Sequence, residues 1–241
     1  ELGYGADVLV SGLFTCAYGQ LSGPGTITAA GGLALSGESL LISGGTLVNA
    51  GHATWTSGNI GLEQDAAIIN GPGALFDVQF DPASLTYEGA EVAVFTFSNA
   101  GTFHVSSVEG TGTVRVQSAA LDNAGVIQVD AGTLFLQPNQ ERPAVWAGAF
   151  TGGPGSTLVL AGPHDLQVSS SVTGPAVQFA SPFGPISIAG RYDVADSTST
   201  TTESPAVYFT AGAALVSTGA VSIDSGTISF STGTAPWTSR P

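Results

Sequence analysis

Acidic side chains are the residues of this chain whose type and spacing could support chemistry. Hydrolysis of a glycosidic bond uses two carboxyl groups about 5–10 Å apart, and several acids lie close together in the sequence. The first candidates flank or lie within residues 77–97, where the rhythm of repeated motifs is interrupted. They are Asp77, Asp81, Glu88 and Glu91. The alternative is that these are solvated acids at turns, and the pattern favours that interpretation.

Three further acids raise the question of calcium. Asp193, Asp196 and Glu203 lie around a stretch rich in serine and threonine, and oxygen ligands are those that Ca²⁺ prefers. The nonapeptide Gly-Gly-x-Gly-x-Asp of calcium-binding β-rolls is absent from the sequence. Calcium therefore stays an open alternative for these residues, and no other cofactor is predicted.

The basic and thiol side chains offer little for catalysis. His52, His104 and His164 have no metal-ligand spacing, and we expect all three on the surface. With a single cysteine, no intrachain disulfide can form. Cys16 lies in a strand-like run and is predicted to be a small buried residue. A lyase that acts on acidic sugars would need a basic residue and cations, yet the chain has no lysine.

The charge balance excludes several classes of partner. Eighteen acids face four arginines, for a formal net charge of -14. Because such a chain repels phosphate, nucleic-acid binding is excluded, and anionic lipids and polyuronate sugars are disfavoured. No apolar stretch approaches the ~20 residues of a membrane span, so membrane insertion is not expected. The N-terminus lacks a signal-peptide pattern.

A short repeated phrase indicates which elements must position these residues. Asn-Ala-Gly occurs three times, beginning at Asn49, Asn99 and Asn123, and each copy lies between short runs that favour β-structure. Asn99 and Asn123 are 24 residues apart, and Gly112 and Gly132, which begin similar Gly-Thr phrases, are 20 apart. Such a period is typical of a solenoid, in which each coil buries its apolar side only against its neighbours.

The sequence thus predicts an all-β fold, a single right-handed parallel β-helix of roughly ten coils. The helix is predicted over residues 1–233, with a linker or tail at 234–241. Residues 77–97 are expected to form an enlarged coil or a projecting hairpin. Polar insertions at 138–143 and 197–205 are expected to be loops.

The asparagines of the repeated phrase have two interpretations. Asn49, Asn99 and Asn123 could stack on asparagines of successive coils, because side-chain amides at equal places form hydrogen-bonded ladders. Alternatively, each could adopt the left-handed turn conformation that asparagine tolerates. The sequence does not decide between a structural ladder and isolated turns.

Several phrases resemble a known style of protein. Thr46-Leu-Val-Asn-Ala-Gly51, Phe97-Ser-Asn-Ala-Gly-Thr-Phe103 and Val129-Asp-Ala-Gly-Thr-Leu134 are similar to the β-solenoid repeats of large bacterial extracellular and surface proteins of the adhesin or autotransporter-passenger type. The resemblance covers nearly the whole chain. It implies a β-helix that is secreted or held at the cell surface. No catalytic motif travels with the phrases, so the resemblance implies no site residues.

These observations predict a non-catalytic extracellular module, either a structural or adhesive stalk or a self-assembling filament or matrix subunit. The expected partners are the chain itself, stacked head to tail, or flanking domains of a longer chain, because both ends look cut. A glycan is a further expected partner. The alternative is a carbohydrate-active enzyme, resembling β-helical glycoside hydrolases, that acts on a neutral glycan. A groove with converging carboxylates would distinguish the enzyme.

Overall fold

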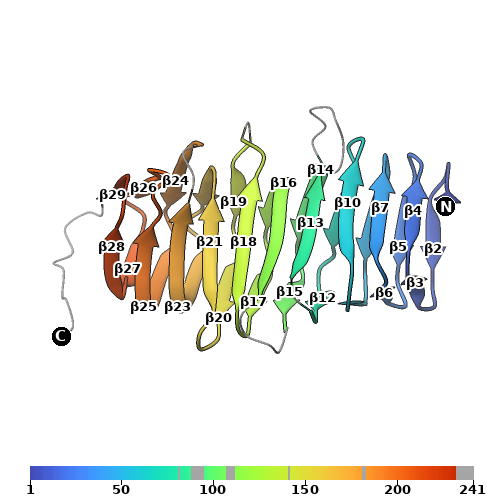
Figure 1. Ribbon diagram of the computed structural model, residues 1–241, viewed down its shortest axis with the longest axis horizontal. Coiled ribbons are helices and arrows are strands. Elements are labelled where there is room, and N and C mark those ends of the chain that lie inside the picture. Colours follow the sequence, from blue (N-terminus) through green and yellow to red (C-terminus); the bar gives the residue numbers. More distant parts are fainter. Residues whose placement is uncertain (81, 88–94, 107–111, 141, 181–182, 232–241) are drawn as a thin grey trace.

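The computed structural model describes residues 1–80, 82–87, 95–106, 112–140, 142–180 and 183–231. Within these ranges the chain is all-β, without a helix, and its strands pair in parallel in a β-solenoid of about ten turns. The chain rises from one end of the rod to the other, so the N-terminal and C-terminal coils lie at opposite ends (Figure 1). The predicted fold class is confirmed. The predicted tail, 234–241, lies outside the described residues.

Three strands in each coil build three faces along the rod. The strands β16, β23 and β25 turn a corner and contribute to two faces each. The first face contains β1 (Leu2–Gly3), β4 (Gly19–Ser22), β7 (Ser39–Ser43), β10 (Asn59–Glu63), β13 (Ala83–Tyr87), β16 (Thr113–Asn123), β18 (Thr133–Pro138), β21 (Thr157–Ala161), β23 (Ser171–Ala180), β25 (Arg191–Thr200) and β28 (Ala220–Ile223).

The second and third faces follow in the same order along each coil. The second face contains β2 (Val8–Val10), β5 (Thr26–Ala29), β8 (Thr46–Asn49), β11 (Ala67–Asn70), β14 (Phe95–Asn99), the end of β16, β19 (Ala144–Trp146), β22 (His164–Leu166), β24 (Pro185–Ile188), β26 (Ala206–Phe209) and β29 (Thr227–Phe230). The third face contains β3 (Phe14–Cys16), β6 (Leu33–Leu35), β9 (His52–Trp55), β12 (Leu75–Val78), β15 (Thr102–Val105), β17 (Val126–Val129), β20 (Ala149–Gly152), the starts of β23 and β25, and β27 (Ala214–Ser217).

The strand register reproduces the spacing of the sequence phrases. Asn99 pairs with Asn123 and Thr113 with Thr133, so intervals of 24 and 20 residues each complete one coil. The coil from Asn70 to its partner Asn99 is enlarged to 29 residues. Residues 88–94 within it lie outside the described residues. The expected loop at 197–205 is only partly a loop, because residues 197–200 belong to β25 and pair with β28.

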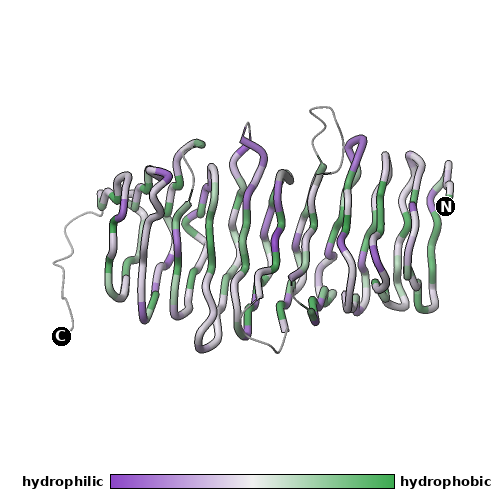
Figure 2. Tube along the Cα trace, viewed as in Figure 1, coloured by the Kyte–Doolittle hydropathy of each residue, from purple (hydrophilic) through white to green (hydrophobic). Residues whose placement is uncertain are grey.

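The core is a set of stacked side chains from the inner side of every coil. Strand residues alternate between the inside and the outside, and Thr133–Pro138 shows the pattern with Leu134 and Leu136 buried. Hydrophobic residues recur in coil after coil along the rod (Figure 2). Aromatic rings from neighbouring coils touch, as Phe76 and its strand partner Phe103 do, with centroids 5.8 Å apart. Cys16 is part of this core, and burial raises the pKa of its thiol to about 11.

Glycine closes the Asn-Ala-Gly phrase because the backbones of successive coils approach each other there. A Cβ atom at Gly125 would collide with the carbonyl oxygen of Gly101, and one at Gly148 with that of Gly125. The corner is therefore restricted to glycine by contact between coils. This explains why the phrase recurs at coil spacing.

Removal of an inward leucine tests this packing. Leu134 is fully buried and pairs with Val114 in one neighbouring coil and Leu158 in the other. We expect Leu134→Ala to lower the free energy of unfolding by about 2–5 kcal/mol, because it leaves a cavity between three coils. Chemical denaturation measures the change. The outward-facing Thr157→Ala serves as the control and should stay within about 0.5 kcal/mol of wild type. Equal effects of the two substitutions would contradict the register.

Candidate functional site

Four buried asparagines form a continuous amide ladder inside the rod. Asn49 donates from Nδ2 to Oδ1 of Asn70 at 2.8 Å, Asn70 donates to Asn99 at 2.7 Å, and Asn99 donates to Asn123 at 2.7 Å. The Nδ2 atoms of the first three also donate to a backbone carbonyl, as Asn99 does to Val126 at 3.0 Å. None of the four asparagines has a left-handed backbone. The ladder satisfies amides that burial would otherwise penalise.

The ladder occupies one position of the second face and is bounded by apolar residues on both sides. In the coil before it the position is Ala29, and in the coil after it Trp146 takes the place next to Asn123. Asn70 lies between Asn49 and Asn99, although it begins Asn-Gly rather than Asn-Ala-Gly. An asparagine followed closely by glycine is the signal that would have identified it.

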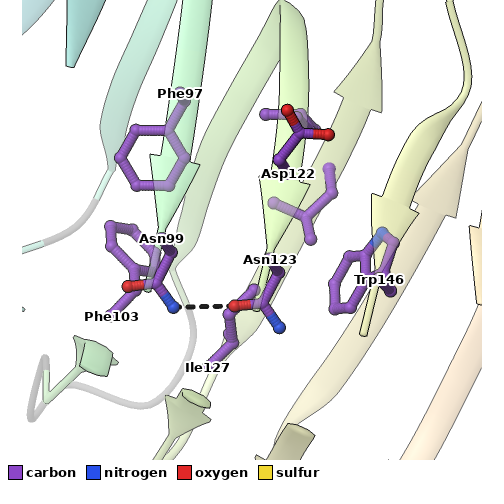
Figure 3. A pocket seen from close by; sticks show the side chains of 9 residues that line it. Phe97, Asn99, Phe103, Asp122, Asn123, Ile127 and Trp146 are labelled. Atoms are coloured by element: carbon purple, nitrogen blue, oxygen red, sulfur yellow. Dashed lines mark hydrogen bonds between the residues drawn. The ribbon is translucent and has the colours of Figure 1, made fainter. Parts of the chain in front are cut away.

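A small cavity borders the end of the ladder. It has a volume of about 20 Å³, and its lining includes Phe97, Phe103 and Trp146 beside Asn99 and Asn123 (Figure 3). This is room for about one water molecule. The amides beside the cavity already bond to each other, as the dashed line between Asn99 and Asn123 shows. The cavity is therefore a packing gap within the core, and its volume is too small for a ligand.

A cluster of three ionisable side chains lies on the outer side of the third face. His104 lies between two carboxylates of neighbouring coils, with Nδ1 3.2 Å from Oδ1 of Asp77 and Nε2 3.0 Å from Oδ2 of Asp130. Amides and a hydroxyl complete the group. Gln79 donates to Asp77 at 2.7 Å, Ser106 donates to Asp77 at 2.6 Å, and Gln128 donates to Asp130 at 2.9 Å.

This polar cluster links three successive coils through charge and hydrogen bonds. A neutral imidazole carries one N–H and can donate to one of the two carboxylates, whereas a doubly protonated imidazole can donate to both. The hydrogen bond from Gln128, and then the contact with His104, lower the pKa of Asp130, while its partial burial opposes them. Ser106 directs its hydroxyl to Asp77, so the arrangement is not that of a Ser-His-Asp nucleophile.

The structure describes one of the four candidate carboxylates of the enzyme hypothesis. Asp77 is largely buried, and its two oxygens are engaged by Gln79, Ser106 and His104. Asp81, Glu88 and Glu91 lie outside the described residues. The sequence pattern gave no indication of Asp130 as a neighbour of Asp77, because only the stacking of coils brings them to the same imidazole.

The three acids considered for calcium lie on different parts of the coil. Asp193 is on the third face and accepts a hydrogen bond from Arg191 at 2.6 Å. Asp196 is exposed at the corner within β25, and Glu203 lies beyond the far end of that strand. Among the described residues, no group of three or more histidine, cysteine, aspartate or glutamate side chains could hold a metal ion.

His164 is buried in the core, contrary to the expectation that it lies on the surface. Its Nδ1 accepts a hydrogen bond from the indole Nε1 of Trp146 at 3.2 Å, which fixes the neutral tautomer with the proton on Nε2. Burial lowers the pKa of His164 to about 4, although the nearby carbonyls of Ala161 and Leu136 favour the charged form. Its sequence neighbours, Pro163 and Asp165, gave no sign of a hydrogen-bonded pair within the core.

No family model matches the chain, and the searches of curated proteins and of solved structures also found no match. In the part of the chain that the structure describes, no helix is long and apolar enough to cross a membrane.

Interruption of the ladder should destabilise the rod. Asn99→Ala leaves the Nδ2 of Asn70 without its acceptor and the Oδ1 of Asn123 without its donor. We therefore expect the free energy of unfolding to fall by about 2–5 kcal/mol. In a chain that already carries Asn123→Ala, the same substitution should cost less, because one of its partners is gone. Chemical denaturation of the two single variants and the double variant measures this coupling, and strictly additive effects would contradict the ladder.

Burial of neutral His164 should make the fold sensitive to acid. The unfolded chain binds a proton at this residue below about pH 6.5, whereas the folded chain does so only near pH 4. Stability from this group is therefore present above pH 6.5 and is lost as the pH falls towards 4, by about 3 kcal/mol. Denaturation at several pH values should show a shallower slope in His164→Phe than in wild type.

The exposed His52 provides the matched control for this measurement. His52→Gln should keep the wild-type dependence of stability on pH. A slope that is unchanged in His164→Phe would contradict the assignment of His164 as a buried neutral residue.

Proposed function

We propose that this chain is a non-catalytic extracellular structural module, a stiff rod that extends when its end coils stack head to tail on a second copy. The observation that carries the proposal is the exposure of core-type side chains at both ends. A solenoid whose terminal coils lack a polar cover offers apolar surface and open strand edges to another coil.

The N-terminal coil exposes residues that inner coils bury. Leu2 is 47% exposed, whereas its partner Leu21 in the next coil is 4% exposed. Val8 is also exposed, whereas its strand partner Ile27 in the next coil is buried. The first strand of each face pairs with a neighbour on one side only in the described residues. Its other edge is available to a further coil.

The C-terminal coil presents a matching surface. Val221 and Ile223 are both about half exposed, whereas their partners Thr198 and Thr200 in the preceding coil are fully buried. Phe230 stacks on Phe209 of the preceding coil, with ring centroids 4.9 Å apart. The outer side of this coil thus carries apolar groups in the row that forms the core elsewhere in the rod.

Charge favours growth along the axis over clumping from the side. With a net charge of -14 and no lysine, the long sides of two rods repel each other. At the ends, apolar contact and axial backbone hydrogen bonds oppose that repulsion. The resemblance of the repeats to those of bacterial surface proteins supports a secreted or cell-surface adhesin stalk, filament or matrix subunit. The alternative is that a flanking segment of a longer chain packs against these end coils in place of a second copy.

Sedimentation velocity of the 241-residue chain tests head-to-tail stacking. We expect oligomers that grow with concentration and with ionic strength, because salt screens the repulsion between rods. Leu2→Lys and Ile223→Lys each place a charge on one end and should each abolish the oligomers. An equal mixture of the two variants should restore dimers but nothing longer, because each variant retains one intact end.

Val168→Lys is the matched control. Val168 is as apolar and even more exposed than the end residues, but it lies on the side of the rod after β22. This variant should assemble as wild type does. A wild-type chain that stays monomeric at high concentration would contradict self-assembly and leave a flanking segment as the occupant of the ends. Failure of the mixture to form dimers would contradict head-to-tail contact.

A further inference from the structure

A groove of about 850 Å³ lies across the outer side of β16, β18, β21 and β23, on the first face. These four strands lie in neighbouring coils, so the groove follows the rod axis over three spacings of about 4.8 Å. Residues from the corners after β23 and after β25, including Phe183 and residues 201–204, line its side. This size is typical of ligand sites.

The floor of the groove is an apolar strip outside the core. Val159, Ala161 and Ala180 are buried and form a cluster with Phe135 that is separate from the core inside the coil. Other side chains of the chain already cover this cluster, so the apolar surface open to a ligand lies beside it, on Phe183, which is 45% exposed. Arg115 extends over the ring of Phe135, with Cζ 4.8 Å from the centroid.

The rim supplies hydrogen-bonding groups of both kinds. Gln137 and Gln178 offer amides, Gln137 in turn accepts a hydrogen bond from Gln117 at 3.0 Å, and hydroxyls come from threonines and one serine. Among the described residues that line the groove, the two charged ones are Arg115 and Glu203, and they are of opposite sign. An exposed aromatic side chain, Phe183, beside these donors and acceptors matches a sugar chain, whose rings have apolar faces and hydroxyl edges.

Charge and backbone pairing narrow the class of ligand. An anionic sugar or a phosphate would meet Glu203 and the field of a chain with net charge -14. An extended peptide that binds by strand addition needs an open sheet edge. The strands of the floor already pair with the coils on both sides, so they have no such edge. A neutral, hydroxyl-rich ligand remains the best match.

We propose that the groove over β16, β18, β21 and β23 is a binding site for a neutral oligosaccharide. This site is independent of the end surfaces, so loss of glycan binding and loss of stacking are separately measurable. The groove has one lining carboxylate, Glu203, among the described residues, and the inference is therefore one of binding, without a hydrolytic step.

Binding to an array of neutral oligosaccharides, including β-glucans, α-glucans, mannans and xylans, tests the proposal. Hexagalacturonate and a random peptide library are the comparison probes. We expect retention on one class of neutral sugar, with its dissociation constant then measured by calorimetry. Gln178→Ala should weaken that binding at least fivefold. Thr202 is exposed at the corner after β25, so Thr202→Ala tests the same groove without altering a strand residue.

Gln20→Ala is the matched control, because Gln20 is a glutamine of the first face that lies outside the groove. It should bind within twofold of wild type, and all three variants should melt at the wild-type temperature. Absence of retention on every neutral sugar would overturn the proposal. Wild-type affinity in both Gln178→Ala and Thr202→Ala would also overturn it, as would a preference for hexagalacturonate or for a peptide.

Discussion

Every part of this molecule depends on one constraint, namely that each strand must find its backbone partners in the coils before and after it. Parallel pairing along the axis fixes equivalent residues at one strand spacing, so each inward position becomes a row that runs through the rod. Rows of leucine, valine and phenylalanine then bury one another without a second layer of structure. No coil can satisfy this requirement alone, which makes the fold cooperative along its axis.

Rows also explain how the rod tolerates polar groups. An asparagine alone in the core would leave its amide unpaired, but Asn99 in register with Asn70 and Asn123 finds both a donor and an acceptor. The same logic operates outside, where His104 meets one carboxylate from each neighbouring coil. In both cases a residue type that would destabilise a single coil stabilises a stack, because the strand register places complementary groups of neighbouring coils side by side.

The constraint fails where the stack stops, and the function that we propose arises there. Leu2 and Ile223 belong to rows that are buried in the middle of the rod but exposed at its ends. The side of the rod differs, since its surface varies freely from coil to coil. That freedom allows a local groove around Phe135 without disturbing the core. Ends and sides can therefore serve assembly and recognition separately.

The sequence by itself determined the architecture, because the recurrence of Asn-Ala-Gly at coil spacing is a local signal that every coil repeats. It also predicted that Cys16, which lies in a strand-like run, is buried. Only the tertiary structure decided which outward residues meet. Asp77 and Asp130 are 53 positions apart, His164 bonds to Trp146 within the core, and residues 201–204 join Arg115 in one groove. The physical reason is that coils differ in length, so contacts between them depend on the summed lengths of all the intervening turns, which no local pattern encodes.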